Sequence, residues 1–301
     1  MRPAFSAAAV FVFFFGAIPG LAAPDTELDA LLKKGSAAVV NQTHALSGLY
    51  ALESSTTRTG RTKSGDRLQG VPGALDSSVH WVDSGDQLPL LERTVLRPGP
   101  AAGVPGDDFP NVIAFARLGD SHPSANRSGT WIGSPTAPLA LLLPTEMSRI
   151  EWSLGGCYRQ RCHLEFRETK SPSLWRTTAN GDVPARGGFT LDEETGEVVD
   201  VGLTATTDPT MAAAISGGAE APRGQRFRYD VVVQFARVEG FEHRVPTAMV
   251  EMYDESPAPT SDELSQLYQA KPSGREQVDA SFSRVTLASR VEYRDYSLTP
   301  R

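Results

Sequence analysis

The chain of 301 residues is acidic, with 36 Asp and Glu residues against 29 Lys and Arg residues and a net charge of −7. This balance argues against nucleic acid or an anionic membrane surface as a partner, because both attract clustered Lys and Arg. The 27 Gly and 22 Pro residues, without Leu-rich heptads, argue against a helical bundle or a coiled coil.

The first two dozen residues predict a secretory signal peptide over residues 1–22. Arg2 supplies the positive start, Ala7–Ile18 is an apolar run, and Gly20-Leu21-Ala22 offers small residues to a signal peptidase. The alternative, a transmembrane anchor, is disfavoured because the run is shorter than the ~20 residues that a membrane helix needs. No later stretch is apolar enough to span a bilayer. We therefore expect an exported, periplasmic or extracellular protein with one β-rich domain over residues 24–301 and no transmembrane segment after cleavage.

Two segments have the pattern of a helix. Pro24–Val40 places apolar residues at helical spacing behind Thr26, which is a suitable N-cap. Thr260–Gln269 begins with a capping box made by Thr260 and Glu263. We therefore expect one substantial N-terminal helix and one short helix near residues 260–269.

Most of the other patterned segments alternate apolar and polar residues, which is typical of strands with one buried face. Strands are expected within residues 46–58, 79–95, 226–235, 245–253 and 278–298. Residues 98–129, rich in Gly, Pro, Ala and Asp, are expected to be irregular. The run Leu139–Leu143 fits either a short buried strand or a single helical turn, and periodicity does not choose between them.

Four or five short β-type segments follow one another from about Arg149 to Leu203, within the stretches RIEWSLGG, CHLEFRET, SLWRTT, GGFTLD and EVVDVGLTA. Turn signals separate them, among them Asn180-Gly181 and Glu194-Thr195-Gly196. The segments therefore predict an antiparallel meander within a mainly β fold.

The two cysteines, Cys157 and Cys162, predict a disulfide, because an exported chain meets an oxidising environment. A zinc site that includes His163 is the alternative, but it lacks a fourth ligand. Pairing Leu154 with Leu164 would align Gly156, not Cys157, with Cys162. The sequence therefore predicts a β-bulge at Gly155-Gly156 together with the bridge, or no bridge at all.

No motif for catalysis or metal binding stands out. The chain lacks a G-x-S-x-G elbow, and its five His residues are scattered, so each is expected at the surface. Two carboxylate pairs, Glu165 with Glu168 and Glu251 with Asp254, are expected to face solvent rather than form a glycosidase site. The acidic stretch 192–197 lacks the ligand spacing of a calcium loop and is interpreted as a hairpin turn. We therefore expect no catalytic residue, no metal site and no cofactor.

Five stretches carry a family resemblance: FRETKSPSLWRT (166–177), VPARGGFTLDEETGEVV (183–199), YDVVVQFAR (229–237), VPTAMVEMY (245–253) and SRVEYRDYSL (289–298). In these stretches the chain resembles a family of uncharacterised exported bacterial proteins. The meander is also similar to the half-open β-barrel of periplasmic lipoprotein-sorting carriers, the LolA- and LolB-like proteins. That resemblance implies a strongly curved antiparallel sheet, wrapped around helices, with an apolar concavity for acyl chains.

Eight aromatic residues are the candidate lining of such a concavity: Trp131, Trp152, Phe166, Trp175, Phe189, Phe227, Tyr229 and Phe235. They fit two interpretations, the filled core of a curved sheet or the wall of a cavity for a lipid or other apolar ligand. Together with the resemblance, they predict a cell-envelope protein that binds or carries an apolar ligand without catalysis. The alternatives are a structural or protein-interaction module of the envelope, and a hydrolase whose site the sequence does not reveal.

Overall fold

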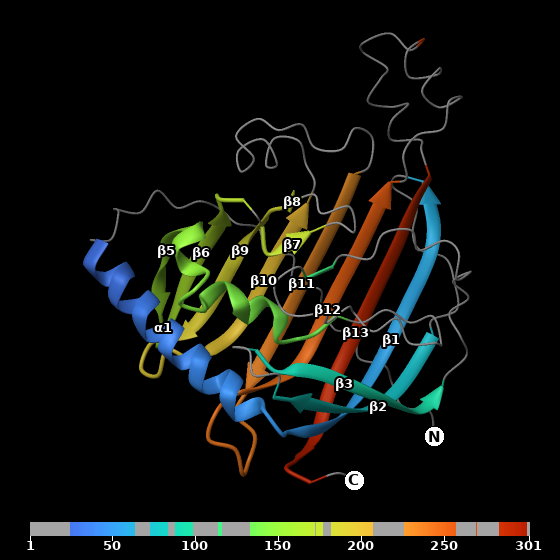
Figure 1. Ribbon diagram of the computed structural model, residues 1–301, viewed down its shortest axis with the longest axis horizontal. Coiled ribbons are helices and arrows are strands. Elements are labelled where there is room, and N and C mark those ends of the chain that lie inside the picture. The colour runs from blue at the N-terminus through green and yellow to red at the C-terminus, as the bar shows by residue number, and fades with distance from the viewer. Residues whose placement is uncertain are drawn as a thin grey trace.

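The computed structural model describes residues 25–63, 73–83, 88–98, 114–115, 133–171, 173–176, 182–206, 226–256, 269 and 283–299. Its main element is an antiparallel sheet of ten strands that does not close into a barrel, with the N-terminal helix α1 (Asp25–Leu46) against one face (Figure 1). This confirms the fold class expected from the sequence. The helix expected at Thr260–Gln269 lies outside the described residues, except for Gln269.

The ten strands of the large sheet are, in chain order, β1 (Tyr50–Lys63), β2 (Gly73–Val82), β3 (Leu90–Pro98), β5 (Ile150–Tyr158), β6 (Arg161–Glu168), β9 (Ala185–Asp192), β10 (Val198–Thr206), β11 (Arg226–Ala236), β12 (Val245–Ser256) and β13 (Ser283–Ser297). Their order across the sheet is β3-β2-β1-β13-β12-β11-β10-β9-β6-β5. The first strand, β1, therefore pairs with the last, and β3 and β5 form the two edges. In Figure 1, α1 crosses in front of the strands near β5, whereas β2 and β3 turn over the opposite end of the sheet.

Three short strands form a second sheet in the order β4 (Ala114–Phe115), β7 (Trp175–Arg176) and β8 (Asp182–Val183). The SLWRTT segment therefore leaves the meander, where it was expected, and β9 pairs directly with β6. The cause is Glu168, whose buried carboxylate accepts hydrogen bonds of 2.8 Å from the backbone N–H groups of Leu174 and Ala185. These bonds return the start of β9 to the end of β6, and Trp175–Arg176 and Asp182–Val183 pair in the small sheet instead.

The helix α1 continues beyond its expected end at Val40 and stops at Leu46. Gln42 and Leu46 are buried, so the added residues extend the inward face of the helix. Gly48, with φ +83, then adopts the left-handed conformation that commonly follows a helix. The next strand therefore begins at Tyr50 rather than at residue 46.

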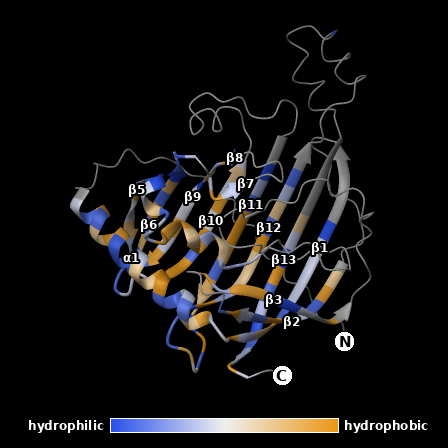
Figure 2. Ribbon diagram, viewed as in Figure 1, coloured by the Kyte–Doolittle hydropathy of each residue, from blue (hydrophilic) through white to orange (hydrophobic). Residues whose placement is uncertain are grey.

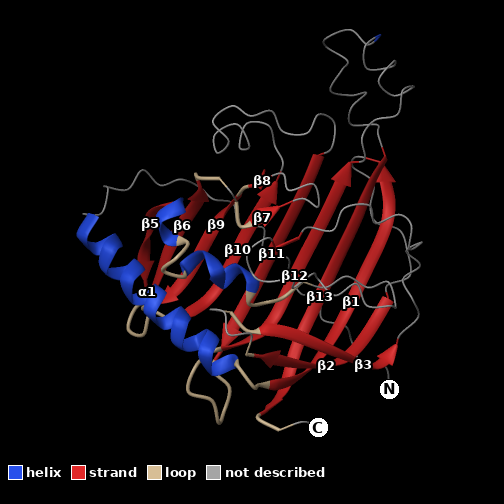
Figure 3. Cartoon of the chain, viewed as in Figure 1, coloured by secondary structure: helices blue, strands red, loops and turns tan. Residues whose placement is uncertain are grey.

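Within the run at residues 139–143, Leu139–Leu142 is helical and Leu143 is extended, so of the two alternatives that the sequence left open the structure has the helical turn. It forms the 3-10 helix η1 (Ala137–Leu142), followed by η2 (Met147–Arg149). Every residue of Thr136–Leu143 is buried, and η1 contacts α1 on the same side of the sheet (Figure 3). We call Thr136–Leu143 the cover, because it lies over the inner face of the sheet.

The hairpin of β5 and β6 has the predicted bulge and the predicted disulfide. Leu154 pairs with Leu164, the register then shifts, and Cys157 pairs with Cys162. Gly156 has φ +115, a backbone conformation that favours glycine. The bridge between Cys157 and Cys162 is present in the structure. The sequence argument about register is therefore confirmed.

Alternation along β11 places Tyr229, Val231, Val233 and Phe235 in the core, as the sequence predicted, while Val232 between them is 48% exposed. The pairing of β12 with β11 is also confirmed, and one long strand, β13, occupies the C-terminal region where one or two were expected. Figure 2 shows hydrophobic residues concentrated on β10 and β11, whereas β1 and β13 carry more hydrophilic ones. The strands near β10 and β11 are therefore more apolar than β1 and β13 (Figure 2).

Several predictions concern residues that the structure does not describe. The signal peptide over residues 1–22 and the turn at Asn180-Gly181 lie outside the described residues. So does the expected irregular region 98–129, apart from Pro98 and the short strand β4.

Candidate functional site

The inner face of the sheet is polar where β1, β13 and β12 lie side by side. Glu53, Ser55 and Thr57 of β1 are buried, and Ser289 of β13 pairs with Thr57 on one side and with Glu251 of β12 on the other. Strand alternation brings these residues to one face, because every second side chain points the same way. A buried polar surface must supply its own hydrogen-bond partners, and these side chains provide several of them.

An ion pair between Glu53 and Arg93 lies on this polar surface. The Nε of Arg93, on the edge strand β3, is 2.9 and 3.0 Å from the two carboxylate oxygens of Glu53. The Arg93 and Glu53 side chains are 3% and 0% exposed. Burial would lower the pKa of Arg93, but the neighbouring charge of Glu53 raises that pKa above its ordinary value. Arg93 therefore stays charged inside the protein.

Gly133 connects this ion pair to a second buried carboxylate. The Nη2 of Arg93 donates to the carbonyl oxygen of Gly133 at 2.8 Å. The N–H of Gly133 donates to Glu251, 3.1 Å from each carboxylate oxygen, and the hydroxyl of Tyr229 donates to Oε2 of Glu251 at 2.9 Å. Three strands, β3, β11 and β12, thus hold both backbone polar groups of one glycine.

The protonation of Glu251 is governed by its burial. Burial raises the pKa of Glu251 to about 7, although the hydrogen bonds from Gly133 and Tyr229 and the charge of Arg93 favour the ionised form. Burial and the neighbouring charge of Glu251 also raise the pKa of Tyr229 well above its ordinary value. Burial and the charge of Glu53 have the same effect on the pKa of Tyr293. Glu251 therefore titrates near neutral pH, whereas both tyrosines stay neutral.

This arrangement suits the binding of one N–H and one C=O group that lie close together. Glu251 is the acceptor and Arg93 is the donor. Tyr229 hydrogen-bonds to Glu251, and Glu53 accepts from Arg93, so both side chains are held in position. We refer to Glu53, Arg93, Tyr229 and Glu251 as the clamp. Within the part of the chain that the structure describes, no three His, Cys, Asp or Glu side chains are grouped as a metal site requires.

Three of the predicted aromatic residues contact one another at the apolar end of the sheet. The ring centroids of Trp152 and Phe166, Trp152 and Phe189, and Phe166 and Phe189 are 5.7, 6.0 and 5.5 Å apart. Phe166 and Phe189 are buried, and Trp152 is half-buried. These three rings therefore fill part of the core.

The remaining predicted aromatic residues are dispersed. Trp175 is buried in the small sheet, Phe235 is buried near the end of β11, and Tyr229 belongs to the clamp. Trp131 and the side chain of Phe227 lie outside the described residues. The structure therefore divides the predicted set between an aromatic core cluster, the small sheet and the clamp.

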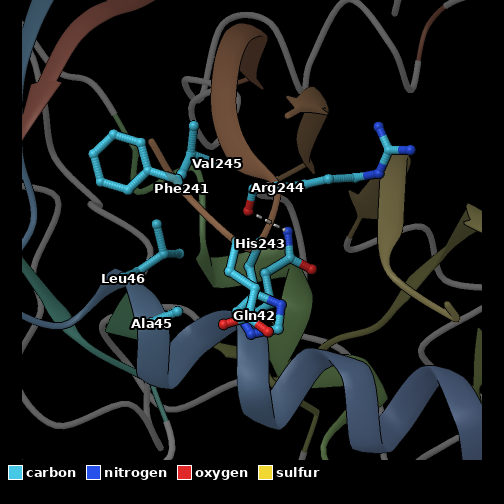
Figure 4. A pocket seen from close by; sticks show the side chains of 8 residues that line it. Gln42, Ala45, Leu46, Phe241, His243, Arg244 and Val245 are labelled. Carbon is cyan, nitrogen blue, oxygen red and sulfur yellow. Dashed lines mark hydrogen bonds between the residues drawn. The ribbon is translucent and has the colours of Figure 1, made fainter. Parts of the chain in front are cut away.

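A small pocket opens between the C-terminal part of α1 and the loop that joins β11 to β12. It measures about 30 Å³, and Figure 4 shows Leu46, Phe241 and His243 among the side chains that line it. Gln42 also lines it and donates through Nε2 to the carbonyl oxygen of Arg244 at 2.9 Å. Such a volume holds one or two water molecules, so this pocket is too small for an acyl chain.

The acidic turn between β9 and β10 is bound by basic side chains. Glu197 accepts from Arg237 Nη2 at 3.0 Å and lies 2.9 Å from Nδ1 of His243. Arg244 donates to Asp192 at 3.1 Å. Partial burial would raise the pKa of Asp192, but hydrogen bonds from Thr195 and Arg244 lower it below its ordinary value. The hairpin turn is therefore confirmed, and its carboxylates join the turn to the β11–β12 loop.

The expectation that both carboxylate pairs face solvent is wrong for one member of each pair. Glu168 and Glu251 are 5% and 1% exposed, whereas Glu165 is exposed and Asp254 is half-buried. Glu168 shares the strand parity of Phe166, which was the signal for its burial. No such signal exists on β12, because apolar residues occupy both of its faces.

The five histidines were expected at the surface, and the structure describes four of them. His44 is exposed, whereas His163, His80 and His243 are half-buried. The ring of His80 stacks on Tyr50 with a centroid distance of 4.0 Å. His122 lies outside the described residues.

Sequence reasoning did not single out Glu53, Arg93 or Gly133. Arg93 alternates with Leu91 and Val95 along β3, so its parity with apolar residues was a usable signal for an inward position. Glu53 alternates in the same way with Ala51. Gly133 gave no signal, because its role depends on strands from distant parts of the chain.

None of the described helices is long and apolar enough to cross a membrane. No protein-family model matches the chain, and no curated protein or solved structure is significantly similar to it. The likeness to exported bacterial proteins and to lipoprotein-sorting carriers therefore stays a prediction.

Proposed function

We propose that this protein binds or carries an apolar ligand, such as a lipid acyl chain, between the inner face of its open sheet and the cover, without catalysis. The observation that carries this proposal is the way in which the cover is attached. Among the described residues its backbone hydrogen bonds stay local: Ala137 donates to Ser134, Leu139 to Thr136 and Leu143 to Ala140. The cover is therefore not a strand of the sheet, and its movement would leave strand pairing intact.

The cover holds its place through apolar contacts. Leu139, Leu141 and Leu142 are each 0% exposed and belong to the same core cluster as the inner side chains of the sheet. The hydrophobic effect is not directional, so an acyl chain of similar area would replace these contacts with little loss. A ligand space would thus form when the cover moves, although the aromatic cluster fills the core when the cover is in place.

The clamp supports a binding role rather than a catalytic one. Its carboxylates and its guanidinium group hydrogen-bond to one another or to Gly133 and are enclosed by protein. A general acid or base requires contact with a substrate proton. In the closed arrangement of the described residues, Gly133 occupies that position.

The test is native mass spectrometry of the mature protein purified from its envelope, with solvent extraction of any bound mass. We expect a discrete mass that extracts as lipid. Titration with cis-parinaric acid then compares the wild type with Leu141→Ala, which weakens the cover, and with Leu298→Ala, whose side chain is 70% exposed. Leu141→Ala should bind the probe more tightly and Leu298→Ala should match the wild type. The proposal would be contradicted if the protein shows no bound mass after incubation with lipid vesicles and if none of the three proteins binds the probe.

A protein-interaction module is the second candidate, and the outer face of the sheet favours it. Val232 and Val250, which are paired across β11 and β12, are 48% and 53% exposed, and Met252 beside them is 41% exposed. Exposed apolar side chains that adjoin one another mark many interaction surfaces. On this alternative, Val250→Glu should reduce retention of the protein in isolated envelopes several-fold and leave its urea midpoint unchanged.

A further inference from the structure

The clamp binds Gly133 through groups that any glycine unit presents. Its acceptor, Glu251, takes the N–H, and its donor, Arg93, takes the C=O of the same residue. Neither contact involves a side chain of the bound residue. What the clamp recognises is therefore an N–H and a C=O group separated by one carbon atom.

The clamp also selects for the absence of a side chain on that carbon atom. A Cβ on Gly133 would lie 2.9 Å from Oε2 of Glu251 and 2.9 Å from the hydroxyl oxygen of Tyr229. Both of those atoms are fixed by the hydrogen bond that joins them. Even the smallest side chain would therefore have to displace a buried carboxylate or a buried phenol.

The surroundings of the clamp are suited to a ligand with one polar and one apolar end. Gly133 lies three residues before the cover, so the clamp adjoins the apolar contacts of the cover. The hydroxyl of Ser77, which is paired across the strands with Glu53, is fully buried and makes no hydrogen bond. A buried hydroxyl of this kind is available to a further polar group of a ligand.

We propose that the clamp is a recognition site for an N-acylated glycine unit whose C=O carries an apolar chain, and that Gly133 occupies this site when the ligand is absent. The ligand N–H would bind Glu251, and its glycyl C=O would bind Arg93. Its apolar chain would continue from that C=O, as the cover continues from Gly133, and would take the place of the cover. This inference rests on the proposed function, because it names the polar end of the apolar ligand. No covalent step is involved.

The experiment compares three ligands that carry the same dodecyl chain on the amide nitrogen that follows the C=O: N-acetyl-N′-dodecylglycinamide, N-acetyl-N′-dodecyl-L-alaninamide, and 2-acetoxy-N-dodecylacetamide, in which an ester oxygen replaces the N–H. Each displaces cis-parinaric acid from the wild-type protein. We expect the glycinamide to bind at least about tenfold more tightly than either analogue, because the alaninamide clashes and the ester removes the N–H donor from a buried carboxylate that then keeps only Tyr229 as donor.

Glu251→Gln tests whether the preference arises at the clamp. This variant should reduce the preference for the glycinamide over the ester several-fold, whereas Glu165→Gln, an exposed control on β6, should leave that preference unchanged. If Glu251→Gln does not fold, the comparison of the three ligands on the wild-type protein still tests the inference. If the affinities of the three ligands agree within about twofold, this inference is overturned, whereas the proposed carriage of apolar ligands is not. If cis-parinaric acid binds and none of the three ligands displaces it, the inference about the clamp is also overturned, but the proposed carriage of apolar ligands is not. If neither the probe nor any ligand binds, both the inference and the proposed function are overturned.

Discussion

The carboxyl group of Glu251 is buried in the core, and two neighbouring residues donate hydrogen bonds to it. The N–H of Gly133 and the hydroxyl of Tyr229 donate to its carboxylate, and Arg93 lies close enough to favour its charge. These interactions do not fully offset burial, so its pKa rises to about 7. Because an ionisable group with a shifted pKa links folding to proton binding, this residue makes stability depend on pH.

We predict that the wild type loses stability as pH rises from about 4.5 to 7, relative to Glu251→Gln. The unfolded chain releases the proton of Glu251 near pH 4.5, whereas the folded protein keeps it until about pH 7. The contribution of this group is therefore fully present below pH 4.5 and is lost as pH rises through 7, by about 3 kcal/mol. Urea denaturation at several pH values measures the difference. Parallel curves for the wild type and Glu251→Gln would show that water reaches this carboxyl group.

A second residue-level prediction concerns Gly133. Gly133→Ala should destabilise the protein by about 1–3 kcal/mol, because the new methyl group meets the buried oxygens of Glu251 and Tyr229. Gly202→Ala is the matched control, since a Cβ there lies 3.7 Å from Val232 Cγ2, an ordinary contact. Urea midpoints of both variants give the comparison. Equal midpoints for the two variants would mean that the chain at residue 133 moves away without cost.

Among the elements, the β5–β6 hairpin shows how far sequence reasoning can reach. Leu154 and Leu164 fixed the register by their apolar parity, and the two cysteines then required one extra residue in β5. Gly155-Gly156 was the place where a bulge costs least, because glycine accepts a positive φ. A local pattern and a covalent constraint thus determined this element together.

We predict that removal of the disulfide costs about 2 kcal/mol, because the bridge closes a loop across a sequence separation of 5 residues. The variant Cys157→Ala/Cys162→Ala should show this loss in urea denaturation. A reducing agent should lower the wild type to the same midpoint and leave the variant unchanged. A loss of much more than 2 kcal/mol would indicate that the bridge also supports the edge strand β5.

Other elements could not be predicted, because contacts distant in sequence decide them. SLWRTT has the composition of a strand in the large sheet, yet Glu168 brings Ala185 back to β6 and excludes that segment. Leu139–Leu142 is helical, and its side chains are buried in a core whose other residues come from distant parts of the chain. The positions of Arg93 and Glu251 follow from alternation, but their meeting at Gly133 depends on the curvature of the whole sheet.

At the scale of the whole molecule, the sheet is open, and its two edges carry features that hinder pairing with another sheet. On β5, exposed Glu151 forms an ion pair of 2.6 Å with Arg167, and the bulge interrupts the regular ladder. On β3, exposed Glu92 faces solvent and Pro98 ends the strand. Charged residues, bulges and proline at sheet edges reduce edge-to-edge aggregation.

The sheet depends on its last strand for continuity. The strand β13 lies between β1 and β12, so β1, β2 and β3 join the rest of the sheet through it. We predict that a chain ended after residue 282 shows no cooperative unfolding transition, whereas a chain ended after Leu298 unfolds as the full chain does. Circular dichroism during urea denaturation distinguishes the two. A cooperative transition in the shorter chain would mean that the remaining strands fold without β13.

The pairing of β1 with β13 also has a consequence for biosynthesis. Thr57 and Ser289 share a hydrogen bond although they are 232 residues apart in the sequence. At typical rates of translation, the ribosome needs roughly 10 to 50 s to make the intervening chain, and throughout that time β1 lacks its partner. The complete sheet therefore forms only after Ser283–Ser297, the residues of β13, have been synthesised. Until then, the edges of β1 and β12 that face β13 lack their strand partner.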